Sequence, residues 1–340
     1  MSLILSPDDP RLTWQGAVSV QYTNGFAIPW RIPYRDGALY PLPLVERAAM
    51  PAGVRLSFFS DTTILAGGLV PWPSASDPDP AQEASPLDLY CDRVMVGRAA
   101  LTQAGEFRFE GLSAGAKLVE LWLPQFGVFR MRSLELSDGA SVWPFEDGRP
   151  RWVTYGSSIT HCRAAESPSF TWPAIVAREH GLNLTCLGFG GQCHLDPLMA
   201  RVMRDLPADY ISLKVGINIK GAASLNERTF RSGIVGFVQI VRENHPEVPL
   251  VLISPIYSPP HEDEPNQVGF TLATMRDEVA EAAIALVRNG DCNVHYLDGR
   301  ELLGPGDESF LAEDGVHPTA EGYKLIGRRF LEKVAKLVFV

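Results

Sequence analysis

From residue 152 onward, the sequence alternates short apolar runs with longer segments of helical spacing. The apolar runs are four or five residues long, and the segments between them place apolar residues every three or four positions, as amphipathic helices do. Strands separated by helices form a parallel sheet that helices cover on both faces. The sequence therefore predicts a three-layer α/β/α domain with a five-stranded parallel sheet, its strands at residues 152–155, 184–187, 211–215, 250–253 and 294–297.

The first ~145 residues follow a different pattern, in which apolar and polar residues alternate over several short segments. Residues 106–110, E-F-R-F-E, are an example, and turn signals such as Asp138-Gly139 separate the segments. No segment has a convincing helical pattern, so we expect two sheets packed face to face. A polar segment with Pro and Gly around residues 143–150 marks the boundary. The prediction is a β-sandwich accessory domain over residues 1–147 and an α/β catalytic domain over residues 148–340.

The composition argues against several classes of protein. The 340-residue chain has a net charge of -10 and no basic stripe, so we expect no nucleic-acid partner. No apolar run reaches membrane-spanning length, and the first residues lack the basic segment of a signal peptide. The five cysteines form no regular framework, which favours reduced thiols in a cytoplasmic protein. A Pro/Ser/Asp-rich stretch over residues 71–86 predicts a mobile surface loop.

Groups suited to acyl transfer follow most of the predicted strands. A serine is a poor nucleophile unless a base takes its proton and amide donors meet the oxyanion. Asp314 stands three residues before His317, so its carboxylate can reach Nδ1 and leave Nε2 free as a base toward Ser158. Each feature alone has a structural explanation, as a helix N-cap, a turn or a loop hydrogen bond. Their position beyond strands of one sheet and their order along the chain together favour a serine acyl-transfer site. The candidate residues are Ser158, Gly190-Gly191, Asn218, Asp314 and His317.

At these residues the chain resembles the GDSL, or SGNH, hydrolase family. That family is named for a serine, a glycine, an asparagine and a histidine in four ordered blocks. The blocks read G-S-S-I at 156–159, G-F-G-G at 188–191, G-I-N-I at 216–219 and D-G-V-H at 314–317. With the preceding β-sandwich, the chain also resembles a two-domain subgroup of acyltransferases and carbohydrate esterases. The resemblance implies a flavodoxin-like catalytic sheet behind a jelly-roll-like sandwich.

The resemblance also implies a role for each block. Ser158 is expected to be the nucleophile and His317 the base, oriented by Asp314. The oxyanion hole is expected to combine the N–H groups of Ser158 and Gly191 with the side-chain amide of Asn218. This chemistry needs no metal and no organic cofactor.

The chain departs from the family pattern at two positions. Ser157 stands where the family has an aspartate before the nucleophile, and Ile219 stands where it has one after the asparagine. Neither position carries the proton transfer, so the departures bear on loop details and substrate rather than on catalysis.

Two Cys/His pairs, His161-Cys162 and Cys193-His194, follow the serine and glycine blocks. In one interpretation His161, Cys193 and His194 line the substrate pocket. In a second, Cys162 and Cys193 form a disulfide or a close thiol pair. A Cys/His metal site is a third, disfavoured because neighbouring residues in an extended or helical segment point apart.

The sequence thus predicts a serine esterase that hydrolyses small acyl esters, such as esters of a sugar or a natural product, through an acyl-enzyme. One alternative is an acyltransferase with the same triad, in which an alcohol attacks the acyl-enzyme. A second alternative is an inactive carbohydrate-binding protein that keeps the fold without the activity.

Overall fold

The computed structural model of this chain describes residues 2–70, 86–101 and 105–339. They form two compact units, the first made of residues 1–148 with Ser167–Ser169, the second of residues 149–166 and 170–340. The surface loop expected over residues 71–86 lies, apart from Pro86, outside the described residues.

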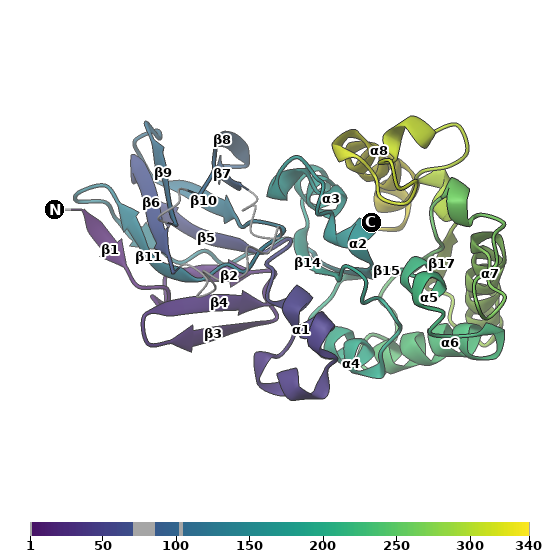
Figure 1. The fold of residues 1–340 in the computed structure, drawn as a ribbon. Coiled ribbons are helices and arrows are strands. Elements are labelled where there is room, and N and C mark those ends of the chain that lie inside the picture. The colour runs from purple at the N-terminus through teal and green to yellow at the C-terminus, as the bar shows by residue number, and fades with distance from the viewer. Residues whose placement is uncertain (1, 71–85, 102–104, 340) are drawn as a thin grey trace. The chain divides into compact units, whose positions relative to one another are not determined.

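The first unit is built from short antiparallel strands (Figure 1). In chain order they are β1 (Leu3–Leu5), β2 (Thr13–Gln15), β3 (Ser19–Thr23), β4 (Phe26–Trp30), β5 (Arg55–Ser60), β6 (Ile64–Leu69), β7 (Leu87–Cys91), β8 (Val94–Ala99), β9 (Glu106–Glu110), β10 (Lys117–Trp122), β11 (Met131–Leu136) and β12 (Val142–Trp143). One sheet has the order β3-β4-β11-β6-β9, with β1 paired to β11. The other has the order β12-β5-β10-β7-β8, with β2 paired to β5. Among the described residues these are the two sheets of the unit, as the alternating pattern predicts.

The core of this unit lies where the apolar faces of the two sheets meet. In β9, Phe107 and Phe109 are buried while the flanking Glu and Arg side chains are exposed, which is the period-two pattern of a half-buried strand. A continuous cluster of buried side chains joins strands of both sheets, for example Phe58 and Leu121 of one sheet with Leu65 and Leu134 of the other. Burial of these apolar faces is the main stabilising term of the sandwich.

One element of this unit was not expected from the sequence. Helix α1 spans Leu42–Ala48 and follows a 3-10 turn at Tyr34–Leu39. Prolines at positions 41 and 43 disguise the helix, because proline usually interrupts helical patterns. In the first turn, however, proline is tolerated because the N–H that it lacks would have no intrahelical partner.

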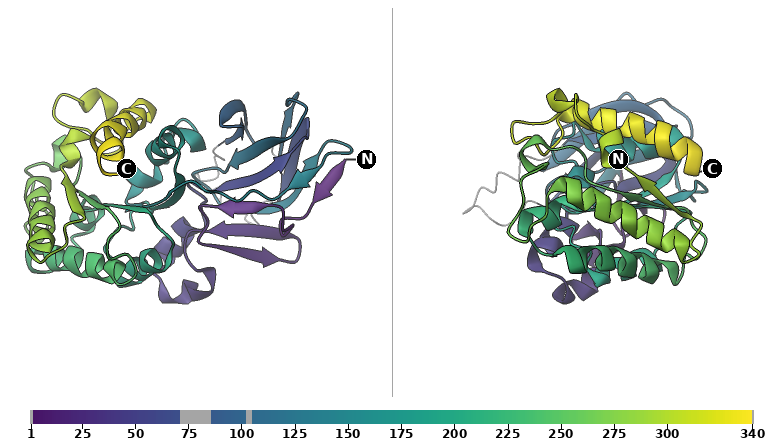
Figure 2. Two further views of the ribbon diagram at one scale, coloured as in Figure 1. Left: turned by 180° about the vertical axis from the view of Figure 1, so that it is seen from behind. Right: turned by 90° about the vertical axis from the view of Figure 1, so that its right-hand side faces the viewer.

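The second unit is a parallel sheet with helices on both faces (Figures 1 and 2). Its strands are β13 (Arg151–Gly156), β14 (Asn183–Gly188), β15 (Tyr210–Lys214), β16 (Leu250–Ile253) and β17 (Val294–Leu297), in the spatial order β14-β13-β15-β16-β17. This order places the second strand of the chain beside the first and then continues outward, which is the flavodoxin-like arrangement. The five-stranded α/β/α architecture predicted from the sequence is confirmed.

The helices of this unit lie between the strands and after the last of them. They are α2 (Ser158–His161), α3 (Trp172–His180), α4 (Pro197–Asp205), α5 (Ile217–Ala222), α6 (Glu227–Arg242), α7 (Leu272–Arg288) and α8 (Ala320–Phe330), which continues through one π-helical turn at Leu331–Ala335 into α9 (Lys336–Val338). Helix α3 packs against α8, and α6 packs against both α4 and α7. None of the helices within the described residues is long and apolar enough to cross a membrane.

The strand register brings the carboxyl ends of the central strands level with one another. Gly156 of β13 pairs with Gly188 of β14 on one side and with Lys214 of β15 on the other. Residues that follow these strands therefore share one edge of the sheet, where open α/β sheets place their ligand sites.

Candidate active site

Ser158 lies at a tight turn that connects strand β13 to helix α2. Strand β13 ends at Gly156, and the Oγ of Ser157 caps α2 by accepting the Ile159 N–H at 3.3 Å. Ser158 is then the first residue of the helix. A Cβ at Gly156 would overlap the side chain of Thr160, and one at Gly188 would overlap the backbone around Thr160. Two glycines at the strand ends thus let α2 lie directly against the sheet edge.

The structure brings Ser158, His317 and Asp314 into one hydrogen-bonded chain. Ser158 Oγ lies 2.8 Å from His317 Nε2, and His317 Nδ1 lies 2.6 Å from Asp314 Oδ2. Asp314 Oδ1 accepts the backbone N–H groups of Val316 and His317, both at 2.9 Å. Because a carboxylate only accepts, Nδ1 carries the proton and Nε2 is left as an acceptor facing the serine hydroxyl.

The Asp314 carboxylate is strongly held in its ionised form. Partial burial by itself would raise its pKa, but the hydrogen bonds from the His317 backbone, the His317 ring and the Val316 backbone outweigh burial, and the pKa falls to about 2. The side chains of His317 and Asp314 are 41% and 49% exposed. The hydrogen-bonded arrangement expected of a triad is therefore present, and its His and Asp side chains are accessible from solvent.

Three N–H donors are candidates for the oxyanion hole expected from the sequence. The N–H of Ser158, at the start of α2, and the N–H of Gly191 bond to no acceptor within the described part of the chain. Asn218 Oδ1 accepts the Cys193 N–H at 3.1 Å, which orients the amide and leaves Nδ2 to donate elsewhere. An oxyanion hole requires donors of this kind, preorganised and unpaired before substrate arrives.

Asn218 is placed by the start of helix α5. Gly216 precedes this helix with φ +125°, a conformation open to glycine, and a Cβ there would come within 2.6 Å of Pro255. Ile219, which replaces the family's aspartate, is completely buried, so this position contributes to the core instead of the site. Ser157, at the other departure, serves as the helix cap.

Of the three residues expected to line the pocket, Cys193 and His194 belong to residues 190–194, named the oxyanion loop after its expected role, and His161 of α2 contacts this loop. His161 is almost fully buried, and its Nδ1 accepts the Gly190 N–H at 3.4 Å. Cys193 is equally buried and donates its N–H to Asn218. His194 is half-buried and contacts Ser224 Oγ at 2.8 Å and the Gly191 carbonyl at 3.0 Å. A role in lining the pocket stays a prediction, whereas contacts that support the loop are present.

Cys162 and Cys193 do not form the disulfide considered from the sequence. Both are free and buried. Burial raises the pKa of Cys193 to about 12 and that of Cys162 well above the ordinary value, so both are neutral thiols at neutral pH. Among the described residues, no three His, Cys, Asp or Glu side chains are grouped so that they could hold a metal ion.

Two polar residues near this edge were not singled out from the sequence. Lys214 ends β15 and is buried, and burial lowers its pKa to about 8. Ser224 follows α5 and holds the ring of His194. A polar residue closing an apolar strand is a weak signal for Lys214, and no sequence signal marks Ser224.

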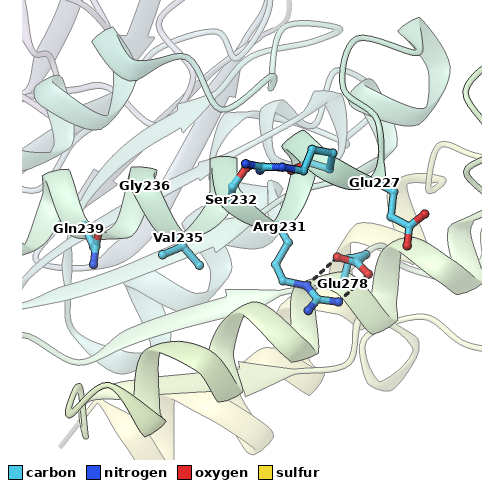
Figure 3. Close-up of a pocket in the computed structure, with 8 residues that line it drawn as sticks. Glu227, Arg231, Ser232, Val235, Gly236, Gln239 and Glu278 are labelled. Atoms are coloured by element: carbon cyan, nitrogen blue, oxygen red, sulfur yellow. Dashed lines mark hydrogen bonds and ion pairs between the residues drawn. The ribbon is translucent and has the colours of Figure 1, made fainter.

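A surface groove in the second unit is separate from these groups (Figure 3). It runs over α6 and α7, where Arg231 and Glu278 form a two-bond ion pair with both N–O distances at 2.7 Å. Its lining contains none of the candidate site residues and consists of Glu227, Arg228, Arg231, Ser232, Val235, Gly236, Gln239 and Glu278. The groove therefore offers no nucleophile–base pair.

Family models match both units of the chain. The model described as "SsfX3, N-terminal domain" matches residues 12–132, and that of the GDSL-like Lipase/Acylhydrolase family matches residues 150–336. A search among curated proteins found no match.

Several solved structures are similar over nearly the whole chain. A salicylyl-acyltransferase, SsfX3, from a tetracycline biosynthetic pathway is 40% identical with a TM-score of 0.90, covering 99% of this chain and 97% of that one. A putative GDSL-like lipase from Bacteroides ovatus is 20% identical with a TM-score of 0.79, covering 99% and 98%. A family two carbohydrate esterase from Cellvibrio japonicus is 15% identical with a TM-score of 0.65, covering 100% and 98%. The latter two similarities are evidence of a shared fold.

Proposed function

This chain belongs to the GDSL-like lipase/acylhydrolase family, an enzyme family that acts on esters, and we propose that it is an acyltransferase that passes an acyl group through Ser158 to an alcohol. One observation carries the choice of transfer. The 40% identity to a salicylyl-acyltransferase extends over 99% of this chain, and the first unit matches the N-terminal domain of the same protein. An activated ester of a small aromatic acid is therefore the proposed acyl donor.

In the first half of the reaction, Ser158 Oγ attacks the carbonyl carbon of the donor while His317 Nε2 takes the hydroxyl proton. The C–O double bond opens to a tetrahedral oxyanion, which the N–H groups of Ser158 and Gly191 and Nδ2 of Asn218 stabilise. Collapse of this intermediate breaks the bond to the leaving group, and His317 returns the proton to it. Asp314 remains ionised throughout and stabilises the imidazolium.

In the second half, the acceptor alcohol takes the position of the leaving group. His317 Nε2 removes its proton as the alcohol oxygen attacks the acyl-Ser158 carbonyl. The second oxyanion collapses, the bond to Ser158 Oγ breaks, and His317 gives the proton to Ser158. A new ester and the free enzyme result.

Hydrolysis, which the sequence by itself predicts, is the second candidate. Its support is the exposure of the triad, since side chains of His317 and Asp314 that are 41% and 49% exposed leave a path for water. The two reactions share every step before deacylation and differ only in which hydroxyl reaches the acyl-enzyme.

A partition experiment tests the proposal. The protein is incubated with p-nitrophenyl salicylate or p-nitrophenyl acetate, with and without a panel of phenolic and sugar alcohols. We expect an alcohol of the panel to accelerate nitrophenol release and to yield an ester at the expense of the free acid. Free acid alone with every alcohol would favour hydrolysis. The absence of both turnover and fluorophosphonate labelling at Ser158 would contradict acyl transfer altogether.

A further inference from the structure

Two histidines bracket the peptide group that carries the Gly191 N–H. On one side, the Gly190 N–H donates to His161 Nδ1 at 3.4 Å, which holds the peptide between Phe189 and Gly190. On the other side, the Gly191 carbonyl lies 3.0 Å from His194 Nε2, and this contact holds the peptide between Gly191 and Gln192. The Gly190–Gly191 peptide lies between these two anchors.

The ring of His194 is held in one tautomer by its two partners. A carbonyl oxygen only accepts, so His194 Nε2 carries the proton that is donated to Gly191. In the neutral ring, His194 Nδ1 then accepts from the hydroxyl of Ser224 at 2.8 Å. Ser224 is itself anchored, since its N–H donates to the carbonyl of Ile219 in α5 at 3.2 Å. The ring of His194 therefore links the oxyanion loop to the helix that carries Asn218.

The backbone at Gly191 needs external support. Gly191 has φ +72°, and a Cβ there would meet no atom within 4 Å, so packing does not restrain it. A glycine in open space can rotate over a wide range of backbone angles. An oxyanion donor must nevertheless stay within about 2.7–3.1 Å of the developing charge to be effective. The direction of this N–H is restricted by hydrogen bonds on the flanking peptides: the turn bond from the Gln192 N–H to the Phe189 carbonyl at 3.0 Å and the contacts with the two histidines.

We propose that His161 and His194 are positioning residues that clamp the Gly191 N–H in the direction of the oxyanion. This inference rests on the proposed function, because it takes the Gly191 N–H as an oxyanion donor. It reassigns the two histidines from substrate contact to support of the catalytic backbone. The rigidity of the loop, however, is measurable without any substrate.

His194→Ala tests the clamp most directly. We expect kcat for p-nitrophenyl acetate to fall about tenfold while KM stays within about twofold, because a misdirected donor weakens transition-state binding alone. His194→Gln should recover kcat to within about threefold, since its amide nitrogen can donate to Gly191 while its oxygen accepts from Ser224. Hydrogen exchange of the peptide over residues 186–196 should be faster in the Ala variant and near wild type in the Gln variant.

His161 provides a second, independent arm. His161→Asn places an amide oxygen near the position of Nδ1 and should keep the Gly190 contact. His161→Leu removes the acceptor and should lower kcat about tenfold with little change in KM. If the Leu variant does not fold, the exchange rate of residues 186–196 in the Asn variant, compared with that in His194→Ala, still reports on the clamp.

His180→Ala is the matched control. His180 is also half-buried, and its Nε2 lies 2.8 Å from the carbonyl of Phe339, away from the oxyanion loop. It should change neither kcat nor the exchange of residues 186–196. A raised KM with unchanged kcat in His194→Ala would overturn the clamp in favour of substrate contact, and so would unchanged exchange. If the wild-type protein turns over no ester, the acyl-transfer proposal fails, while the exchange measurement still decides whether the clamp exists.

Discussion

Asp88 in the first unit and Asp314 in the second both organise serine hydroxyls, with different consequences. Asp88 is completely buried on β7, and its carboxylate accepts directly from the hydroxyl of Ser167 and from the N–H and the hydroxyl of Ser169, the latter two at 3.1 Å and 2.6 Å. Arg98 adds an ion pair with an N–O distance of 2.9 Å. Every group in this cluster has its partner, so the cluster is a rigid support within the first unit.

Asp314 reaches its serine only through an imidazole. His317 lies between the carboxylate and Ser158, and both side chains of the Asp–His pair are partly exposed. A carboxylate, whose ordinary pKa is about 3.9, is too weak a base to take a hydroxyl proton near neutral pH, whereas an imidazole with an ordinary pKa of about 6.5 is suited to the task. If Ser158 is the nucleophile, as we propose, then an interposed histidine and access for a substrate, rather than a serine–carboxylate contact, distinguish a catalytic serine from a structural one.

The largest expected effect separates the two serines directly. Ser158→Ala should lower ester turnover about 10⁵-fold, because the covalent step loses its nucleophile, and should leave the urea unfolding midpoint almost unchanged. Ser169→Ala should do the reverse, since it removes a donor from the buried Asp88. Kinetics and urea denaturation on both variants test this. Full turnover by Ser158→Ala would contradict its assignment as the nucleophile.

Asp88→Ala should show that the first cluster is structural. Removal of the buried carboxylate leaves the serine donors and the Arg98 guanidinium without their acceptor. The free energy of unfolding should therefore fall by about 3 kcal/mol. Urea denaturation measures this loss, and kcat should stay within about threefold. Asp36→Ala, at an exposed site, is the control and should change stability by less than about 0.5 kcal/mol. If Asp88→Ala unfolded at the same urea concentration as the wild type, the structural role of the Asp88 cluster would be contradicted.

Asn218 offers a sharper test of the catalytic side. Asn218→Ala should lower kcat about 10²-fold with little change in KM, as expected when an oxyanion donor is lost. Asn218→Asp keeps an oxygen for the Cys193 N–H but has no Nδ2 donor, so it should be at least as impaired. Near-normal kcat in Asn218→Asp would mean that the contact with Cys193, and not donation to the oxyanion, is what Asn218 contributes.

The smallest effect concerns pH and stability. The folded-state pKa of Asp314 is about 2, below the unfolded value of about 3.9, so its ionised form adds stability above about pH 4 that is lost as the pH falls toward 2. The urea concentration at the midpoint of unfolding should therefore fall less between pH 5 and pH 2.5 for Asp314→Asn than for the wild type. The difference should be modest because the side chain is half exposed. Equal losses in the two proteins would contradict the hydrogen-bonded, ionised Asp314.

The sequence by itself determined the architecture and the family of this protein. Strand and helix periods differ, and apolar faces must be buried, so the alternating patterns specify a sandwich followed by a parallel α/β sheet without knowledge of any contact. Family membership, expected from the four blocks, is confirmed. Because parallel strands end at a common edge, the order of the blocks along the chain predicted that Ser158 and His317 meet, and their side chains are hydrogen-bonded. The domain boundary and the individual catalytic roles stay predictions.

Only the tertiary structure decided how the side chains around this edge are paired. Spacing along the chain does not specify the direction of a side chain or its partners. Sequence patterns therefore left the His161-Cys162 and Cys193-His194 pairs between pocket lining, a disulfide or close thiol pair, and metal binding. In the folded chain, residues 190–194 pack against α2 and α5. As a result, His161 accepts a hydrogen bond from the Gly190 N–H, and His194 donates one to the Gly191 carbonyl. The grouping of Ser167–Ser169 with the first unit, on the buried carboxylate of Asp88, is equally invisible in the sequence. Hydrogen bonds between distant segments depend on the direction in which each segment arrives, and that direction is set by packing of the whole fold.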